Sequence, residues 1–154
     1  MCFTDFDGVL NSANYIKSIG NKFDDPKYQI DPEAVIRLNS ITDATGALIV
    51  VSSTWRLAFD HLDDLITCLS SYGITGKIIG MTPHKPNSTR NTRGKEIQAW
   101  LDNRRLHEND IDSFVILDDD PGVGKLKSYL VRTYFADGLQ DHHVNTVINI
   151  LGKK

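Results

Sequence analysis

The sequence lacks the features of membrane, disulfide-rich and repeat proteins. No apolar run approaches the ~20 residues that a membrane-spanning helix needs. Cys2 and Cys68 are the only cysteines, and they do not have the spacing of a metal site. We expect both to be reduced thiols rather than a disulfide. The sequence also has no internal repeat and no low-complexity segment. Together, these absences indicate an ordinary globular protein.

An excess of positive charge is also lacking. Asp and Glu outnumber Lys and Arg, 20 to 17, which argues against a broadly basic nucleic-acid surface but not against a local one. An acid appears already at Asp5, where the basic and apolar regions of a signal peptide would lie. We therefore expect a cytoplasmic protein without membrane contact. The length of 154 residues suits one domain, and we expect residues 1–154 to fold as a single unit.

Strand and helix signals alternate along the chain. Residues 47–51 and 113–117 are continuous apolar runs, which is typical of parallel strands buried on both faces. A third strand opens the chain at Cys2. The alternation predicts an α/β fold, namely a Rossmann-like, three-layer arrangement whose mainly parallel central sheet is covered by helices on both faces.

One predicted helix has clear boundaries. Asp31 can cap it, Pro32 suits its first position, and Gly46 can end it. The remaining predicted segments are an irregular flap at 11–29, helices at 57–72, from Arg93 onward and at 141–151, short strands at 78–79 and 129–135, and a polar loop at 81–92.

The opening strand ends in two acids that flank Phe6. On a strand, alternating side chains place Asp5 and Asp7 on one side while Phe6 turns into the core. Two such carboxylates repel each other unless a cation binds, and oxygen ligands suit Mg²⁺. The alternative is an acidic loop with an Asx-turn at Asp7 and a glycine turn at Gly8. A calcium EF-hand loop is excluded, because Val9 and the residue after it occupy positions that need oxygen ligands.

Polar residues follow three of the predicted strands. They are Asp5 and Asp7, Ser52 and Ser53, and Asp118 and Asp119, and Lys95 lies near the start of a predicted helix. In parallel sheets, ligands bind beyond the carboxyl ends of the strands. Taken singly, the serines can be turn formers, the lysine a solvated charge and the aspartates a wet loop. Their occurrence together, in this order, favours a functional site.

Such a set of residues suits phosphoryl transfer. Carboxylates from two strands can hold one Mg²⁺, a hydroxyl and backbone amides can bind phosphate oxygens, and a lysine can offset the charge of the transferring group. Asp5, the first acid after the strand, is placed to act as the nucleophile. Asp7 is placed to protonate the leaving oxygen and afterwards to activate water.

The chain resembles the haloacid dehalogenase-like (HAD) superfamily, the aspartate-nucleophile phosphatases. The matching motifs are Asp5-Phe6-Asp7-Gly8-Val9, Ser52 after Ile49-Val50-Val51, Lys95, and Asp118-Asp119 after Val115-Ile116-Leu117, and they span nearly the whole chain. The resemblance implies a HAD-like hydrolase fold in which Asp5 is the nucleophile and a metal ligand. Asp7 is then the acid and base, and its backbone carbonyl also binds the metal. An acid at this position favours a phosphatase over the ATPase and phosphonate-cleaving branches.

The same resemblance assigns the remaining roles. Ser52 and Lys95 hold the phosphoryl group, and the residues alone do not distinguish Ser52 from Ser53 as the donor of the hydroxyl. Asp119, with Asp118 as the second choice, completes the Mg²⁺ site. The histidines have no recognisable pairing, so zinc is not predicted.

Two further details narrow the expected branch. The intervals between motifs are too short for a large cap domain, and capless members of the superfamily tend to act on large substrates or to use a partner as the lid. In addition, the strings Ser52-Ser53-Thr54-Trp55-Arg56, Arg93-Gly94-Lys95-Glu96-Ile97 and Trp100-Leu101 look similar to the HAD domains of bacterial and phage RNA-repair proteins. Those domains resemble the end-healing phosphatase of polynucleotide kinase-phosphatases.

The expected function is a Mg²⁺-dependent phosphomonoesterase. The favoured substrate is a nucleotide or an RNA or DNA terminal phosphate, with Trp55 stacking on a base and Arg56 among the arginines that supply local positive potential. In the alternative, Trp55 is a core aromatic and the arginines are solvated charges. A phosphorylated metabolite, a phosphoprotein, a phosphotransferase reaction and a non-catalytic phosphate-binding or regulatory module remain open. The pattern gives no indication of the oligomeric state.

Overall fold

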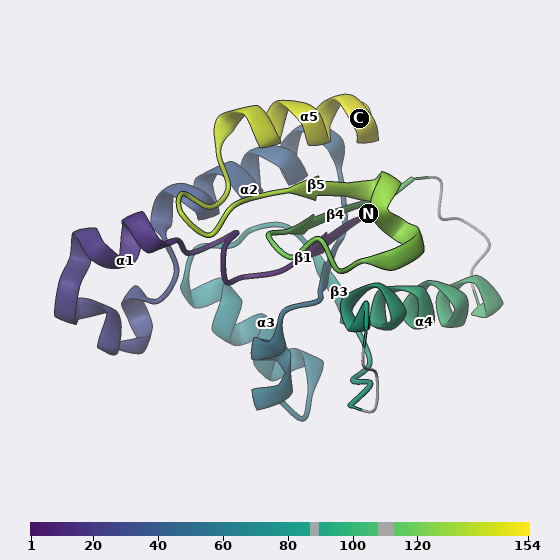
Figure 1. Ribbon diagram of the computed structural model, residues 1–154, viewed down its shortest axis with the longest axis horizontal. Coiled ribbons are helices and arrows are strands. Elements are labelled where there is room, and N and C mark those ends of the chain that lie inside the picture. Colours follow the sequence, from purple (N-terminus) through teal and green to yellow (C-terminus); the bar gives the residue numbers. More distant parts are fainter. Residues whose placement is uncertain (87–89, 108–112) are drawn as a thin grey trace.

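A five-stranded parallel sheet forms the centre of the computed structural model, which describes residues 1–86, 90–107 and 113–154, with only the backbone of residues 105–107 (Figure 1). The strands lie in the order β3-β2-β1-β4-β5, and every neighbouring pair is parallel. Their bounds are β1 Cys2–Thr4, β2 Ile49–Val51, β3 Ile78–Met81, β4 Val115–Asp118 and β5 Leu130–Arg132. The first strand in sequence is therefore the central strand of the sheet.

Helices connect successive strands. The α-helices are α1 Ala13–Ile19, α2 Pro32–Thr45, α3 Leu62–Ser71, α4 Thr92–His107 and α5 Asp141–Leu151, and the 3₁₀ helices are η1 Gly20–Asp24, η2 Pro26–Tyr28, η3 Thr54–Ala58 and η4 Gly124–Tyr129. Helices α2 and α5 lie side by side over one face of the sheet, whereas α4 lies on the opposite side (Figure 1).

The two faces of the sheet are buried in separate apolar clusters. In β1, Cys2 packs in the cluster that contains α2, α3 and α5, whereas Phe3 packs in the cluster that contains α4 and η4. This alternation follows from the pleat of the strand, because successive side chains point to opposite faces. Both faces are covered, so the predicted Rossmann-like, three-layer α/β fold is confirmed.

The helix boundaries read from capping residues are also confirmed. Asp31 Oδ1 accepts a hydrogen bond from Glu33 N at 2.9 Å, and Gly46 ends α2 in the left-handed region with φ 68°. Helix α5 covers the predicted residues 141–151. Cys2 and Cys68 are free thiols, as expected, and burial raises the pKa of Cys2 to about 11.

Three predicted segments differ from the structure. The flap at 11–29 contains α1, η1 and η2, which have no buried residues and hence no apolar periodicity to reveal them. The predicted helix at 57–72 is divided into η3 and α3, because Phe59 and His61 adopt extended backbone between them. The predicted strand at 129–135 is limited to β5, since η4 continues through Tyr129.

The loop predicted at 81–92 is shorter, because Met81 belongs to β3 and Thr92 begins α4, and its residues 87–89 lie outside the described part of the chain. Between β1 and β2 the chain forms only α1, two 3₁₀ turns and α2, and between β2 and β3 only η3 and α3, so the described residues include no cap domain in these intervals, as predicted. Among the helices that the structure describes, none is both long enough and apolar enough to span a bilayer.

Candidate active site

The sheet register brings three polar side chains to one edge. Thr4 pairs with Val51 on one side and with Leu117 on the other. The next residue, Asp5, therefore lies between Ser52 and Asp118. Two backbone hydrogen bonds extend the ladder to this level: Asp5 N donates to Leu117 O at 2.9 Å, and Ser52 N donates to Thr4 O at 3.1 Å.

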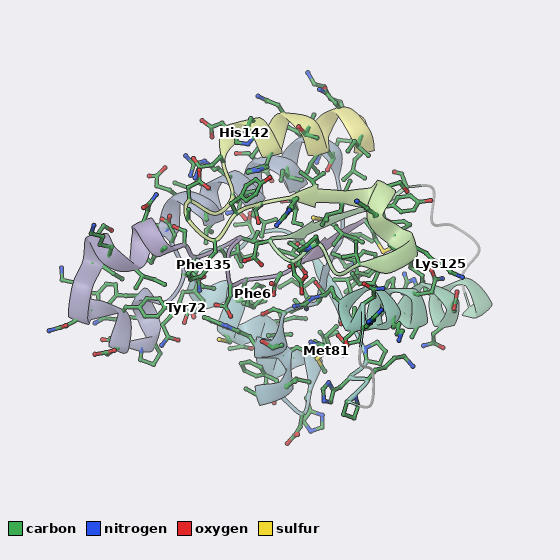
Figure 2. All side chains as sticks on the ribbon, viewed as in Figure 1. Phe6, Tyr72, Met81, Lys125, Phe135 and His142 are labelled. Carbon is green, nitrogen blue, oxygen red and sulfur yellow. The ribbon has the colours of Figure 1, made fainter. Side chains whose placement is uncertain are left out.

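A tight turn follows β1. The carbonyl oxygen of Phe6 accepts hydrogen bonds from the N–H groups of Val9 and Leu10 at 3.0 and 2.7 Å. The Phe6 ring lies in the interior, edge-on to Trp55 with 5.4 Å between ring centroids (Figure 2). The strand thus ends at Thr4, and the expectation that Asp5 and Asp7 extend from one face of a strand is wrong. Asp5 is buried and Asp7 is exposed.

Gly8 allows the turn to approach the second acidic segment. Its φ is 78°, and a Cβ at this position would lie 2.4 Å from Cγ of Asp119. Its carbonyl oxygen accepts a hydrogen bond from Thr133 Oγ1 at 2.6 Å. Asn11 donates from Nδ2 to Asp7 Oδ1 at 2.9 Å, and this bond orients the Asp7 carboxylate. The close approach to Asp119 and the hydrogen bonds with Thr133 and Asn11 therefore hold the turn in place.

Three carboxylates form a candidate cation site. Within the described residues, Asp5, Asp118 and Asp119 each offer an oxygen atom within 4.8 Å of the others. Asp118 Oδ1 accepts the N–H of Asp120 at 2.9 Å, while its buried Oδ2 has no hydrogen-bond partner in the described part of the chain. A set of three carboxylates in which one buried oxygen accepts no hydrogen bond among the described residues fits the ligand preferences of Mg²⁺. The Asp7 carboxylate is outside this group, so a contribution from Asp7 would come from its backbone carbonyl.

Burial and mutual repulsion disfavour the ionised form of this cluster. Burial, with a further contribution from the neighbouring Asp5, raises the pKa of Asp118 to about 8. Burial likewise raises the pKa of Asp5 and of Asp119, although the Arg93 guanidinium opposes the shift at Asp5. A divalent cation would favour the charged form of all three groups.

Arg93 is the cation that contacts the cluster. Its Nε lies 2.9 Å from Asp118 Oδ2, without hydrogen-bond alignment, and its Nη2 lies 3.4 Å from Asp5 Oδ1. Its Nη1 is buried and has no hydrogen-bond partner among the described residues. The sequence analysis names Arg93 at a helix start and within the string that resembles RNA-repair HAD domains, and it assigns Arg93 no individual role at the site. The available signal was its place at the start of the helix that also carries Lys95.

Lys95 lies elsewhere on α4. Successive helical residues are rotated by about 100°, so side chains two positions apart point to opposite sides. Lys95 is exposed and lines a separate hollow of about 350 Å³ with Gln98 and Lys125. Lys125 lies beside α4 (Figure 2). The structure thus brings Arg93, and not Lys95, to the aspartates.

The two serines after β2 have different surroundings. Ser53 Oγ accepts the N–H of Trp55 at 3.2 Å and caps η3. Ser52 is fully buried beside Asp5, and its Oγ has no hydrogen-bond partner in the part of the chain that is described. The Ser52 hydroxyl thus lies next to Asp5 with hydrogen-bonding capacity that the described residues leave unused.

Arg56 is buried and its hydrogen-bonding capacity is used within the protein. Its Nε and Nη groups donate to backbone carbonyls of Ser52, Ser53, Thr82 and Pro83, and its Nη2 lies 2.8 Å from Glu96 Oε2. These partners occupy all five guanidinium N–H groups. Arg56 therefore links the loop after β2 to the loop after β3 and to α4. The Arg56–Glu96 pair was not predicted from the sequence.

A family match assigns this parallel sheet with its acidic edge to the HAD superfamily, a class of phosphatase-type hydrolases. The chain belongs to the family described as "HAD domain in Swiss Army Knife RNA repair proteins", whose model matches residues 1–144. No curated protein and no solved structure matches the chain in the other two comparisons.

Proposed function

We propose that this protein is a Mg²⁺-dependent phosphomonoesterase that acts through an aspartyl-phosphate intermediate on Asp5. One observation carries the proposal. Three of the four buried side-chain atoms without a hydrogen-bond partner among the described residues are Ser52 Oγ, Arg93 Nη1 and Asp118 Oδ2, and all three belong to the site around Asp5. A hydroxyl, a guanidinium and a carboxylate oxygen are the groups that a phosphate and a divalent cation together would engage.

The phosphoryl group would be held by groups of opposite polarity to the carboxylates. The Ser52 hydroxyl and the free Nη1 of Arg93 can donate to phosphate oxygens, and an arginine is suited to this because its donors are planar and always charged. Lys95 was expected in this role from the sequence. We assign the role to Arg93, because Arg93 contacts both Asp5 and Asp118.

The metal would be held by Asp5, Asp119 and Asp118 together with the backbone carbonyl of Asp7. When bound, Mg²⁺ neutralises charge that develops on the phosphoryl oxygens. It would also remove the repulsion between these buried carboxylates, so that Asp5 is ionised and able to act as a nucleophile.

The first chemical step transfers the phosphoryl group to the protein. A carboxylate oxygen of Asp5 attacks the phosphorus atom while the ester P–O bond breaks and its electron pair passes to the leaving oxygen. The carboxyl group of Asp7 gives that oxygen a proton. Asp7 suits this role because its side chain is exposed and Asn11 orients its carboxyl group through a hydrogen bond to Oδ1.

The second step returns the protein to its starting state. The Asp7 carboxylate takes a proton from a water molecule, whose oxygen attacks the phosphorus atom of the aspartyl phosphate. The bond between phosphorus and the Asp5 oxygen breaks, which releases inorganic phosphate and leaves Asp5 ionised and Asp7 protonated. Both steps thus use the same two side chains in alternating roles.

The proposed substrate is a nucleotide or the terminal phosphate of an RNA or DNA strand. The printed description of the family, which concerns RNA repair, supports this choice. The lack of a cap domain in the described intervals between β1 and β3 is also consistent with a substrate that extends away from the site. Phosphorylated metabolites and phosphoproteins are the competing substrates.

Phosphate release tests the proposal. The substrates are a generic aryl phosphate, 5′- and 3′-nucleotides, and oligonucleotides phosphorylated at either end, each with Mg²⁺ and with EDTA. Wild type is compared with Asp5→Asn and with Asp43→Asn, which replaces an exposed acid on α2 as a matched control. We expect release that depends on Mg²⁺, that is lost in Asp5→Asn and that is retained in Asp43→Asn. Mass spectrometry after acid quench should find a hydroxylamine-sensitive phosphate on Asp5.

The same experiment separates the alternatives. Binding of phosphate ligands without release from any substrate would overturn the proposal in favour of a non-catalytic phosphate-binding module. Appearance of the phosphoryl group on an added alcohol, in place of free phosphate, would indicate a phosphotransferase. Release from sugar phosphates or phosphopeptides, but not from nucleotides, would replace the proposed substrate class while leaving the chemistry intact.

A further inference from the structure

A second cavity lies beside the phosphate site. It has a volume of about 470 Å³ and opens between η3, the end of β3 and α4. Its walls include the side chains of Phe59, Met81 and Trp100, and Met81 lies in the space between α4 and the segment that contains η3 and α3 (Figure 2). The volume falls in the range of about 300–1,000 Å³ that is typical of small-ligand sites.

This cavity adjoins a smaller hollow that reaches Arg93 of the proposed active site. The smaller hollow, of about 180 Å³, is lined by Arg93 and Asp120, and it shares Arg56, Leu57 and His84 with the larger cavity. A substrate whose phosphate lies against Arg93 can therefore extend past His84 into the larger cavity. The group that enters would be the leaving group of the phosphate ester.

The walls favour a flat, uncharged group. Arg56 is the only Lys, Arg, Asp or Glu among the described lining residues, and its N–H groups are engaged by carbonyls and by Glu96. A second phosphate or an acidic peptide would thus meet no unpaired Lys or Arg among the described lining residues. Trp100 is held in place, because its ring packs edge-on to Phe3 with 5.4 Å between centroids and the Arg104 guanidinium lies over one face of the ring, 5.7 Å from its centroid, which leaves the opposite face for a base. Aromatic walls of this kind stack on nucleobases.

Two polar groups can read the edge of such a ring. Thr82 is 3% exposed, and its Oγ1 has no hydrogen-bond partner among the residues described, although it lines the cavity. Asn103 is exposed on α4 and lines the same cavity. A hydroxyl and an amide offer both donors and acceptors, as base edges require.

We propose that this cavity binds the nucleobase of the nucleotide that carries the scissile phosphate. The inference rests on the proposed function and deepens it, because it assigns the leaving group to the walls formed by Trp100, Phe59 and Met81. Trp55 does not line this cavity and packs against Phe6 instead.

A pair of neighbouring substitutions on α4 tests the proposal. Ala99 lines the nucleobase cavity, whereas Gln98 lines the separate hollow beside Lys95. Ala99→Leu fills the cavity and Gln98→Leu adds similar bulk elsewhere. We expect Ala99→Leu to raise KM for nucleoside monophosphates about tenfold, as loss of base stacking predicts, and to leave hydrolysis of acetyl phosphate unchanged. Gln98→Leu should alter neither reaction.

A binding experiment makes the result independent of turnover. Trp55→Phe leaves Trp100 as the only tryptophan, and a nucleoside without phosphate is titrated into this variant, with and without Asn103→Ala. We expect the nucleoside to quench Trp100 fluorescence and Asn103→Ala to weaken the binding. Thermal unfolding checks that each variant is folded.

The outcomes distinguish the two proposals. An equal effect of Ala99→Leu on nucleotides and acetyl phosphate, or absence of quenching by every nucleoside, would overturn the nucleobase site and leave the phosphatase intact. Quenching by nucleosides without hydrolysis of any phosphate would support the nucleobase site and reject the phosphatase. If Ala99→Leu does not fold, Asn103→Ala decides, because its side chain is exposed.

Discussion

Nε of Arg93 lies 2.9 Å from Oδ2 of Asp118, at the centre of a site in which three carboxylates approach one another. The same guanidinium extends to within 3.4 Å of Asp5 Oδ1. Arg93 thus brings a positive charge of the chain itself to the acidic cluster. This arrangement, with one nitrogen of Arg93 left free, makes Arg93 the strongest candidate for binding the phosphoryl group.

Replacement of Arg93 should therefore impair catalysis far more than replacement of Lys95. We expect Arg93→Ala to lower kcat/KM by about 10²–10³, the typical loss when one donor to a developing charge is removed. Lys95→Ala should change it by less than about threefold, because Lys95 is exposed and lines another hollow. Steady-state kinetics on an aryl phosphate measures both effects. The reverse order would restore Lys95 as the phosphate ligand.

The two serines after β2 should respond to substitution in opposite ways. Ser52→Ala should lower kcat/KM about tenfold or more without loss of stability, because the Ser52 hydroxyl has no hydrogen-bond partner within the described residues. Ser53→Ala should lower the free energy of unfolding by about 1 kcal/mol, because it removes the cap of η3. Urea unfolding and kinetics on both variants provide the comparison. A stability loss confined to Ser52→Ala would contradict these assignments.

Gly8→Ala should disrupt the site through contact as well as backbone strain. The added Cβ would lie 2.4 Å from Cγ of Asp119, so this carboxylate must move. Gly20→Ala is the matched control, since Gly20 also has a positive φ, of 57°, but has no atom within 4 Å of the added Cβ. Both changes should cost about 1–3 kcal/mol in backbone strain, and only Gly8→Ala should abolish phosphatase activity. Full activity in a folded Gly8→Ala protein would exclude a role for Asp119.

The stability of the metal-free protein should fall as pH rises from about 4 to about 8. Folding raises the pKa of Asp118 from its ordinary value of 3.8 to about 8, so the folded state holds this proton more tightly and deprotonation favours unfolding. Mg²⁺ requires the ionised carboxylates, so its stabilising effect should grow over the same range. Thermal unfolding with EDTA and with Mg²⁺ measures both trends.

Asp118→Asn provides the control for this pH dependence. It removes the titrating group while keeping a similar shape, so both the fall in stability and the pH-dependent part of the Mg²⁺ effect should weaken. A Mg²⁺ effect that is equal at pH values near 6 and near 8 in wild type would show that the buried carboxylates do not release protons on metal binding.

The Arg56–Glu96 pair should matter for stability. Glu96→Gln leaves the buried Arg56 charge without its partner, and breaking a buried pair typically costs about 3–5 kcal/mol. Arg37→Gln is the control, because Arg37 pairs at 2.9 Å with Asp141, whose side chain is 84% exposed. Such surface pairs contribute about 0–1 kcal/mol. Equal losses in urea unfolding would show that Arg56 is stabilised by its carbonyl partners alone.

Much of the fold could be predicted from local chemistry. Continuous apolar runs marked β2 and β4, because strands buried on both faces cannot alternate with polar residues. The polar residues after these strands could be placed together, since the carboxyl ends of parallel strands meet at one edge. The turn at Phe6 was not predictable from local chemistry. A buried Phe6 is expected both on a continued strand and in a turn that directs its ring towards Trp55, so the sequence pattern does not distinguish the two.

The choice between Arg93 and Lys95 depended on tertiary packing. A Cβ on Gly94 would lie 2.1 Å from the carbonyl oxygen of Val123, so the helix backbone approaches η4 closely at this residue. That approach fixes the rotation of α4 and thereby decides which cation faces Asp5. The role of Arg56 also depended on tertiary packing. The sequence does not show whether the N–H groups of an arginine are free, and those of Arg56 are engaged by Glu96 and four carbonyls.

The hydrogen bonds that extend the ladder past β1 and β2 also bear on how this architecture tolerates change. Asp5 N and Ser52 N are tied to neighbouring strands at 2.9 and 3.1 Å, so the spacing of the reacting groups is set by the sheet itself. Additional residues inserted beyond Ser53 or beyond Asp120 leave those anchors untouched. A single residue inserted within β1 or β2, before these anchors, shifts the strand register and moves Asp5 away from Ser52 and Asp118. Insertions that cover the site can therefore be accommodated in the loops downstream of these anchors without a change in the positions of the reacting groups.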